Sequence, residues 1–197
     1  MTISVMLDSN AWNFLFDRAI DINHELPPEE FAIFITREVE IEICAISNDG
    51  KDGCDKRLLK QYIQDSVALN RVRTSATFGF AEANPAEGPA AYGGFGQATL
   101  QSDQDRDWYK REKTQASILG KPKKGSGLSG NQADAAVAAS SFHCIVLTCD
   151  KKRGLISEAA ELGGKVLFLS DDHLASQSLK QILFSMGSSQ ETEFKAR

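Results

Sequence analysis

The sequence predicts an α/β fold of three layers, in which helices cover both faces of a central, mainly parallel β-sheet. Short apolar runs alternate with longer helical patterns along the chain, and this alternation is typical of parallel strands joined by helices. The runs at 3–7 and 144–147 have the composition of buried strands. A chain of 197 residues is also the length expected for a single domain.

The first third of the chain predicts two strands and three helices. Ser9 or Asn10 can cap the first helix, and Thr36 can cap the second. Val39 and Ile43 recur at helical spacing on the core face of that second helix. The expected bounds, in order, are a strand at 3–7, a helix at 11–16, a strand at 31–35, and helices at 37–47 and 56–69.

A helical and loop-rich insertion is expected at about 50–130. It is predicted to contain a short strand at 77–81, a loop or lid at 84–98 rich in Gly, Pro and Ala, and one polar helix at 103–119. Trp108 and Tyr109 on that helix could stack on nucleic-acid bases, although a core or lid role is the favoured interpretation.

The last third of the chain predicts two more strands within a single domain of residues 1–187. The expected elements are a helix at 132–142, a strand at 144–147, a helix at 155–162, a strand at 165–169 and a helix at 175–186. Residues 188–197 are expected to form a flexible tail.

Bulk properties favour a cytoplasmic protein with no membrane partner. No apolar run approaches the roughly 20 residues of a membrane span, and the N-terminus lacks the pattern of a signal peptide. The net charge of −5 argues against a protein that coats DNA, so any nucleic-acid site must depend on a local basic patch. The cysteines lack zinc-site spacing and are interpreted as reduced core thiols: Cys44, Cys54, Cys144 and Cys149.

Four acidic residues in separate segments are the strongest functional signal. Asp8 and Asp150 directly follow apolar strands, whereas Glu42 and Asp134 lie on predicted helices. Strand ends of a parallel sheet meet at one rim, where gathered carboxylates repel unless a cation joins them. Hard oxygen ligands favour Mg²⁺ or Mn²⁺, which predicts a divalent-metal nuclease. The alternatives are a helix cap for Asp8, a turn for Asp150, a favourable first-turn charge for Asp134 and a solvated helix face for Glu42.

In this order the acids resemble the pattern of the PIN-domain nucleases. The similarity consists of a first strand ending in Asp8-Ser9-Asn10, a Thr-x-x-Val-x-x-Glu segment at 36–42, Asp134 at the head of an Ala-rich helix, and a strand closing on Thr148-x-Asp150. It covers roughly residues 1–48 and 130–170. The long middle section departs from the family, and Glu38 remains an alternative for the second acid.

The resemblance implies a phosphodiesterase that cleaves single-stranded or structured RNA with a metal-activated water; DNA stays open as a substrate. Asp8 and Asp150 would be the principal metal ligands, with Asp134 and Glu42 completing the shell or orienting the water. Asn10 and Thr148 would hold the carboxylates through hydrogen bonds. Many small bacterial members of this family are toxins, so the resemblance also suggests an antitoxin or other protein partner, and a homodimer stays open.

Basic residues lie on both sides of the two C-terminal acids in the sequence. They could hold backbone phosphates near the metal, or they could form a solvated face: Lys121, Lys123, Lys124, Lys151, Lys152 and Arg153.

Two other functions compete with the nuclease. One is a non-catalytic PIN-like binding or scaffold module. The other is a nucleotide-binding protein that uses the Gly-rich segment 125–130, although no strand is expected directly before it. A triad hydrolase is disfavoured, because the chain has no G-x-S-x-G motif and its histidines show no partner pattern.

Overall fold

The structure is a computed structural model of the chain. It describes residues 2–50, 55–77, 98–99, 102–119, 123, 125–129, 131–151 and 153–194.

Six parallel strands form one sheet in the order β4-β3-β2-β1-β5-β6. Every pair of neighbouring strands is parallel, which confirms the predicted sheet. The strands are β1 (Ile3–Leu7), β2 (Phe31–Thr36), β3 (Arg73–Thr77), β4 (Ala98–Thr99), β5 (Ile145–Thr148) and β6 (Val166–Phe168).

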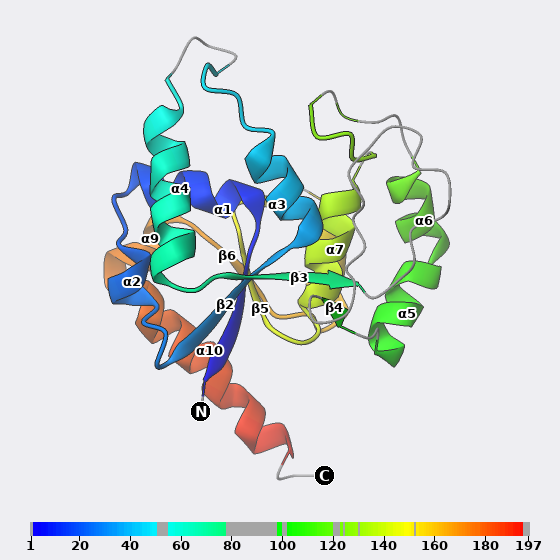
Figure 1. The fold of residues 1–197 in the computed structure, drawn as a ribbon. Coiled ribbons are helices and arrows are strands. Elements are labelled where there is room, and N and C mark those ends of the chain that lie inside the picture. The colour runs from blue at the N-terminus through cyan, green and yellow to red at the C-terminus, as the bar shows by residue number, and fades with distance from the viewer. Residues whose placement is uncertain are drawn as a thin grey trace.

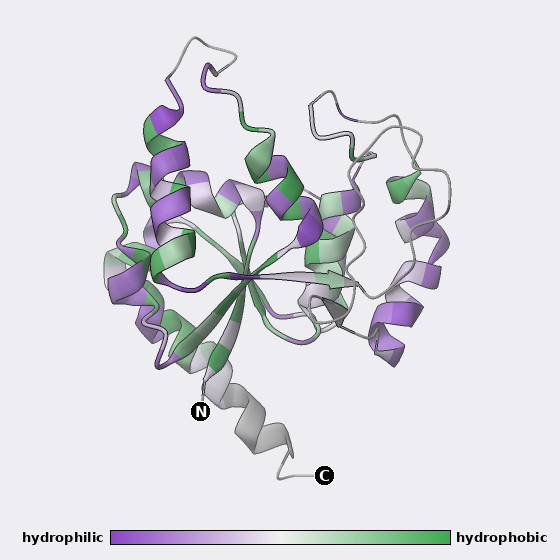
Figure 2. Cartoon of the chain, viewed as in Figure 1, coloured by the Kyte–Doolittle hydropathy of each residue, from purple (hydrophilic) through white to green (hydrophobic). Residues whose placement is uncertain are grey.

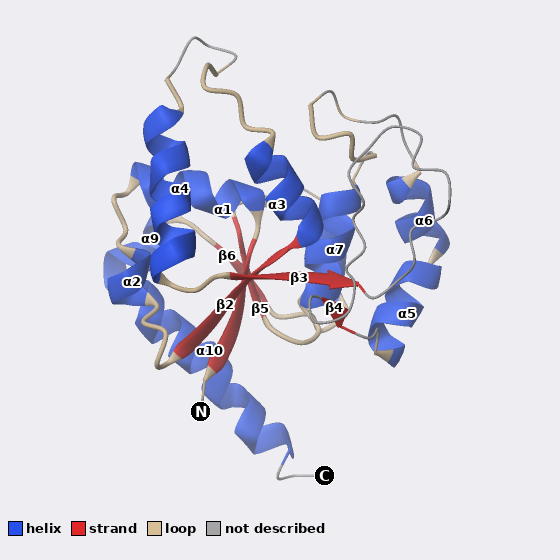
Figure 3. Ribbon diagram, viewed as in Figure 1, coloured by secondary structure: helices blue, strands red, loops and turns tan. Residues whose placement is uncertain are grey.

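Helices cover both faces of this sheet, as the predicted three-layer fold requires (Figures 1 and 3). On one side of the sheet, α1, α2 and α4 pack together and α10 lies against β1 and β5. On the other side, α7 lies against β1, β2 and β5. The helices α3, α5, α6 and α8 contact α7. The helices are α1 (Ser9–Asp17), α2 (Ile22–Glu25), α3 (Arg37–Cys44), α4 (Arg57–Leu69), α5 (Asp103–Lys110), α6 (Glu112–Ile118), α7 (Gln132–Ser140), α8 (Leu155–Glu161), α9 (Asp171–Ser176) and α10 (Leu179–Phe194).

The core lies between the sheet and its two helical layers. Figure 2 shows that the central strands are mostly hydrophobic, and Val5 and Leu7 of β1 are completely buried. The middle of the chain belongs to the same core, because Leu59 and Ile63 of α4 and Trp108 of α5 join the main hydrophobic cluster. The indole of Trp108 donates a hydrogen bond to the Ala135 carbonyl at 3.1 Å, so this side chain has a core role.

Two predicted helices differ from the structure, and the strand β3 was not predicted. The strand expected at 77–81 lies outside the described residues except for Thr77, which ends β3; the mostly polar residues of β3 form a strand by pairing with β2. The single helix expected at 103–119 is two helices, since Arg111 has extended backbone angles (φ −63°, ψ 131°). The last helix extends to Phe194 and therefore includes most of the expected tail.

Most of the expected loop at 84–98 lies outside the described residues. Among the helices that the structure describes, none combines the length and the apolar composition needed to cross a membrane.

Candidate active site

The strand order creates a switch point between β1 and β5. From β1 the chain moves outward through β2, β3 and β4, then returns to the opposite side of β1 with β5. In open parallel sheets, ligands bind beyond the carboxyl ends of the strands at the point where this order reverses. Asp8 follows β1 and Asp150 closely follows β5, so the topology places both acids at that point.

Asp8 is at once a helix cap and a buried site residue. Its extended backbone begins α1, and its Oδ1 accepts a hydrogen bond from the Ser9 backbone at 2.7 Å. Its Oδ2 accepts a hydrogen bond from the Thr148 hydroxyl at 2.7 Å, across the junction of β1 and β5. Only 2% of Asp8 is exposed. The capping interpretation and the site interpretation are therefore both compatible with this position.

Hydrogen bonds donated to Thr148 and Asn10 hold the loop that carries Asp150. The Thr148 hydroxyl oxygen accepts a hydrogen bond from the Asp150 backbone at 3.0 Å while its hydrogen points to Asp8. The Asn10 side-chain carbonyl accepts a hydrogen bond from the Cys149 backbone at 2.7 Å. These contacts fix the relative positions of two acids that are 142 residues apart in the sequence.

Glu42 and Asp134 reach the site from α3 and α7, which contact each other. Lys123 is also present there, since its Nζ forms a 3.0 Å ion pair with Glu42 Oε1. The sequence left Lys123 either on a phosphate-binding patch or on a solvated face; in the structure it supplies positive charge beside Glu42.

The other predicted basic residues are only partly described. Lys151 and Arg153 are exposed in the segment between β5 and α8. Lys121, Lys124 and Lys152 lie outside the described residues.

Electrostatic interactions link the four acids. The pKa of Asp134 is raised to about 6, mainly by burial and also by the charges of Asp8, Glu42 and Asp150, while Lys123 opposes the shift. Burial also raises the pKa of Asp8; hydrogen bonds from Thr148 and Ser9 oppose this, and the charges of Glu42 and Asp150 add to it.

Glu38, the alternative second acid, has a different environment. Burial raises its pKa to about 7, although a hydrogen bond from its own backbone, another from the Thr36 hydroxyl and the charge of Arg37 oppose the shift. Its side chain lines a pocket beside the sheet. The charge of Glu42 acts on Asp8 and Asp134 and also on Glu38, so Glu42 is the α3 acid whose charge reaches the other acids of the cluster.

The donor chemistry of the cluster fits Mg²⁺ or Mn²⁺, since all four groups are carboxylates. The relative positions of the four carboxylates fit such an ion less closely. Within the described residues, no three His, Cys, Asp or Glu side chains are placed to hold one ion together. In this conformation the four acids are near enough to repel one another but do not converge on one point.

A second polar cluster was not found from the sequence. His143 Nε2 lies 3.0 Å from Asp105 Oδ1 and 3.1 Å from the Ser102 hydroxyl. A catalytic triad needs the acid and the serine on opposite ring nitrogens, so this cluster is not one. Ser102 and Asp105 instead form the capping box of α5. Their partner His143 is about forty residues away, and no local spacing could have indicated it.

The Gly-rich segment before α7 lacks the context of a dinucleotide site. Its described residues, 125–129, form a turn and a short bridge, and no strand is described directly before α7. The fold and the acid cluster therefore carry the functional interpretation by themselves: neither a family model, nor a curated protein, nor a solved structure matches this chain significantly.

Proposed function

We propose that this protein is a metal-dependent phosphodiesterase that hydrolyses RNA, similar in design to the PIN-domain nucleases. One observation carries the proposal: four carboxylates from four segments interact at the switch point of a parallel sheet, with Asp8 buried at its centre. Asp8 is buried and the other three acids are partly buried, so their mutual repulsion is costly without a cation, and a functional site is a common reason to retain it.

The position of each of the four acids suggests its role in the proposed reaction. Asp8 and Asp150 would hold the ion from the two sides of the switch point, because Thr148 fixes both of them. Asp134 and Glu42 would complete the shell or orient the attacking water. Bound Mg²⁺ or Mn²⁺ would supply a Lewis acid that activates this water and offsets phosphate charge.

Lys123 is the nearest described cation to this arrangement. Its ion pair with Glu42 neutralises part of the cluster, and 46% of the lysine side chain is exposed. A phosphate that enters the site could therefore replace Glu42 as the ion-pair partner of Lys123, because a lysine ammonium is a compact charge on a flexible side chain.

The direct test is cleavage of end-labelled single-stranded RNA with Mn²⁺ or with EDTA. We expect cleavage only with the metal, and a loss of more than about 100-fold in Asp8→Asn and Asp150→Asn, beyond the losses typical of outer-shell changes. Asp21→Asn is a matched control, because Asp21 caps α2 through a 2.9 Å hydrogen bond from Asn23. Full activity in both site variants would contradict the assignment.

A non-catalytic scaffold is the competing function. Calorimetric titration with Mn²⁺ separates the two: a nuclease binds the ion in a way that depends on Asp8, whereas a scaffold shows no such binding. The cytoplasm is the proposed location, consistent with free thiols at Cys44, Cys144 and Cys149. A toxin role with an antitoxin partner, and a homodimer, remain proposals that rest on the family resemblance.

A further inference from the structure

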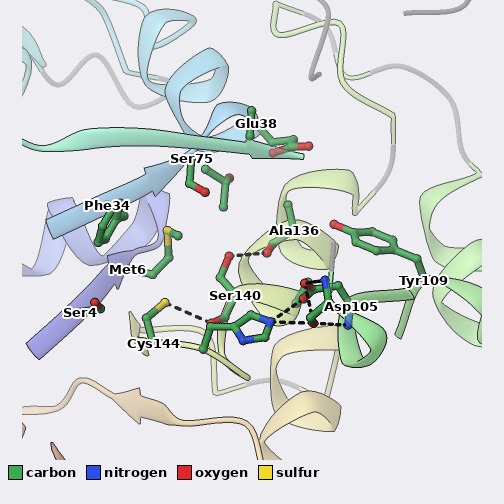
Figure 4. Close-up of a pocket in the computed structure, with 15 residues that line it drawn as sticks. Ser4, Met6, Phe34, Glu38, Ser75, Asp105, Tyr109, Ala136, Ser140 and Cys144 are labelled. Atoms are coloured by element: carbon green, nitrogen blue, oxygen red, sulfur yellow. Dashed lines mark hydrogen bonds and ion pairs between the residues drawn. The ribbon is translucent and has the colours of Figure 1, made fainter. Parts of the chain in front are cut away.

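A pocket of about 370 Å³ lies between the sheet and α5 and α7 (Figure 4). Its size is within the range of small-molecule sites in proteins. Figure 4 shows Met6 and Phe34 on the sheet side and Tyr109 on the opposite side. Glu38 lies at one end of the pocket and Asp105 toward the other.

The pocket and the acid cluster share two helices. Glu38 in the pocket precedes Glu42 by four residues on α3, which is about 6 Å along a helix axis. Ala136 in the pocket follows Asp134 by two residues on α7. The end of the pocket that holds Glu38 is therefore roughly one nucleotide away from the carboxylates.

The lining is suited to a base and not to a phosphate. Its described residues include two acids, Glu38 and Asp105, but no Lys or Arg. The two carboxylates would repel a phosphate there, and the imidazole of His143, which also lines the pocket, is already in contact with Asp105. Met6, Phe34 and Tyr109 provide apolar and aromatic surface of the kind on which bases stack.

Two polar groups of the pocket are placed to accept hydrogen bonds. Burial raises the pKa of Glu38 to about 7, so above that pH it is a carboxylate; the Thr36 hydroxyl and its own backbone hold it, and its remaining lone pairs can accept from a ligand. The Ser140 hydroxyl donates its hydrogen to the Ala136 carbonyl at 2.9 Å, so only its oxygen lone pairs remain. Acceptors of this kind favour a base edge that carries an amino group over one that carries a carbonyl.

We propose that this pocket is a nucleobase site that takes a base with an exocyclic amino group. Its place beside the scissile phosphate rests on the proposed RNA hydrolysis, whereas base binding itself does not. The site would make cleavage depend on the nucleotide next to the bond that is cut. Tyr109 would supply the stacking surface and Glu38 the acceptor for the amino group.

Matched nucleosides test this without cleavage. In EDTA at a pH above the pKa of Glu38, which is about 7, adenosine is compared with purine riboside and cytidine with pyrimidin-2-one riboside by calorimetry; the second member of each pair lacks only the exocyclic amino group. We expect the nucleoside with the amino group to bind about tenfold more tightly or better, since its partner leaves a buried acceptor unpaired. Chemical-shift changes at Ser75 and Tyr109 would locate the bound nucleoside in the pocket.

Glu38→Leu should abolish this preference while Mn²⁺ binding stays unchanged. Glu40→Leu is the control, because Glu40 is on the same helix but lines a different pocket. If the leucine variant fails to fold, Glu38→Met replaces it, since its thioether side chain has a similar length and is only a weak acceptor, so it should likewise remove the preference.

Three results would overturn the nucleobase site: equal binding within each pair, no nucleoside binding at millimolar concentration, or loss of Mn²⁺ binding in Glu38→Leu. The last would make Glu38 a metal ligand. A wild-type protein that cleaves RNA but binds no nucleoside contradicts only the pocket. One that binds nucleosides selectively but cleaves no RNA contradicts only the proposed hydrolysis.

Discussion

Removing one charge from the acid cluster should stabilise the metal-free protein. The change is Asp134→Asn, which keeps the shape of the side chain and removes its negative charge. Burial raises the pKa of Asp134 to about 6, and the neighbouring carboxylates Asp8, Glu42 and Asp150 add to the shift. Above that pH the folded protein carries a charge that the unfolded chain would bear at lower cost.

The size of the effect follows from the shift in pKa. A rise from 3.8 to about 6 is roughly 2 units, and hence about 3 kcal/mol if fully expressed. Asp134 is only partly buried, so solvent screening reduces this to about 1–2 kcal/mol. The first turn of α7 favours a negative charge by about 0.3–1 kcal/mol. This contribution stabilises the ionised wild type, but it is smaller than the penalty from the shifted pKa. The net gain expected for the variant is about 1 kcal/mol.

The sign of the pH dependence follows from the same shift. Because the folded pKa of Asp134 is raised, the folded state binds more protons than the unfolded state between about pH 4 and pH 6. This group therefore destabilises the wild type as pH rises through that window, and the penalty is complete above it. Asp134→Asn should flatten that part of the stability profile.

Urea unfolding in EDTA at pH 7.5 and pH 5 measures both effects. The control is Glu161→Gln, an exposed acid on α8 outside the cluster. With saturating Mn²⁺ the order should reverse, because an ion that binds only the folded state stabilises the wild type more. The reasoning is refuted if Asp134→Asn is no more stable than wild type at pH 7.5, or if both have the same pH dependence.

Three further substitutions test contacts around the site and the core. Thr148→Val should cost about 1–2 kcal/mol, because Asp8 loses its hydroxyl donor, whereas Thr148→Ser should restore most of the urea midpoint. Gly164→Ala should cost about 1–3 kcal/mol in thermal unfolding, since the added methyl would collide with the Ser141 hydroxyl; an unchanged melting temperature would contradict this. Glu158→Gln should cost about 1–2 kcal/mol, because two cations pair with this carboxylate at 2.6 Å, and high salt should shrink the difference.

The sequence alone was sufficient for features that depend on local patterns. β1 has its predicted bounds, because a short run of five mainly apolar residues is typical of a buried strand. Thr36 caps α3 as predicted, since a polar residue at a strand end that begins a helix is a natural cap. The first helix, α1, is capped by Asp8 and not by the expected Ser9 or Asn10. The parallel sheet and its helical layers follow from the alternation of these local patterns.

Tertiary structure decided what depends on pairing between distant segments. The polar β3 is a strand because β2 offers it a hydrogen-bonding edge, so its own composition carries little signal. The ion pair of Lys123 with Glu42 spans 81 residues, and the contact of His143 with Asp105 spans 38. Such contacts leave no local periodicity. The order of the strands and the packing of α3, α5 and α7 on the sheet decided which acids interact. The same features decided whether a pocket lies beside these acids.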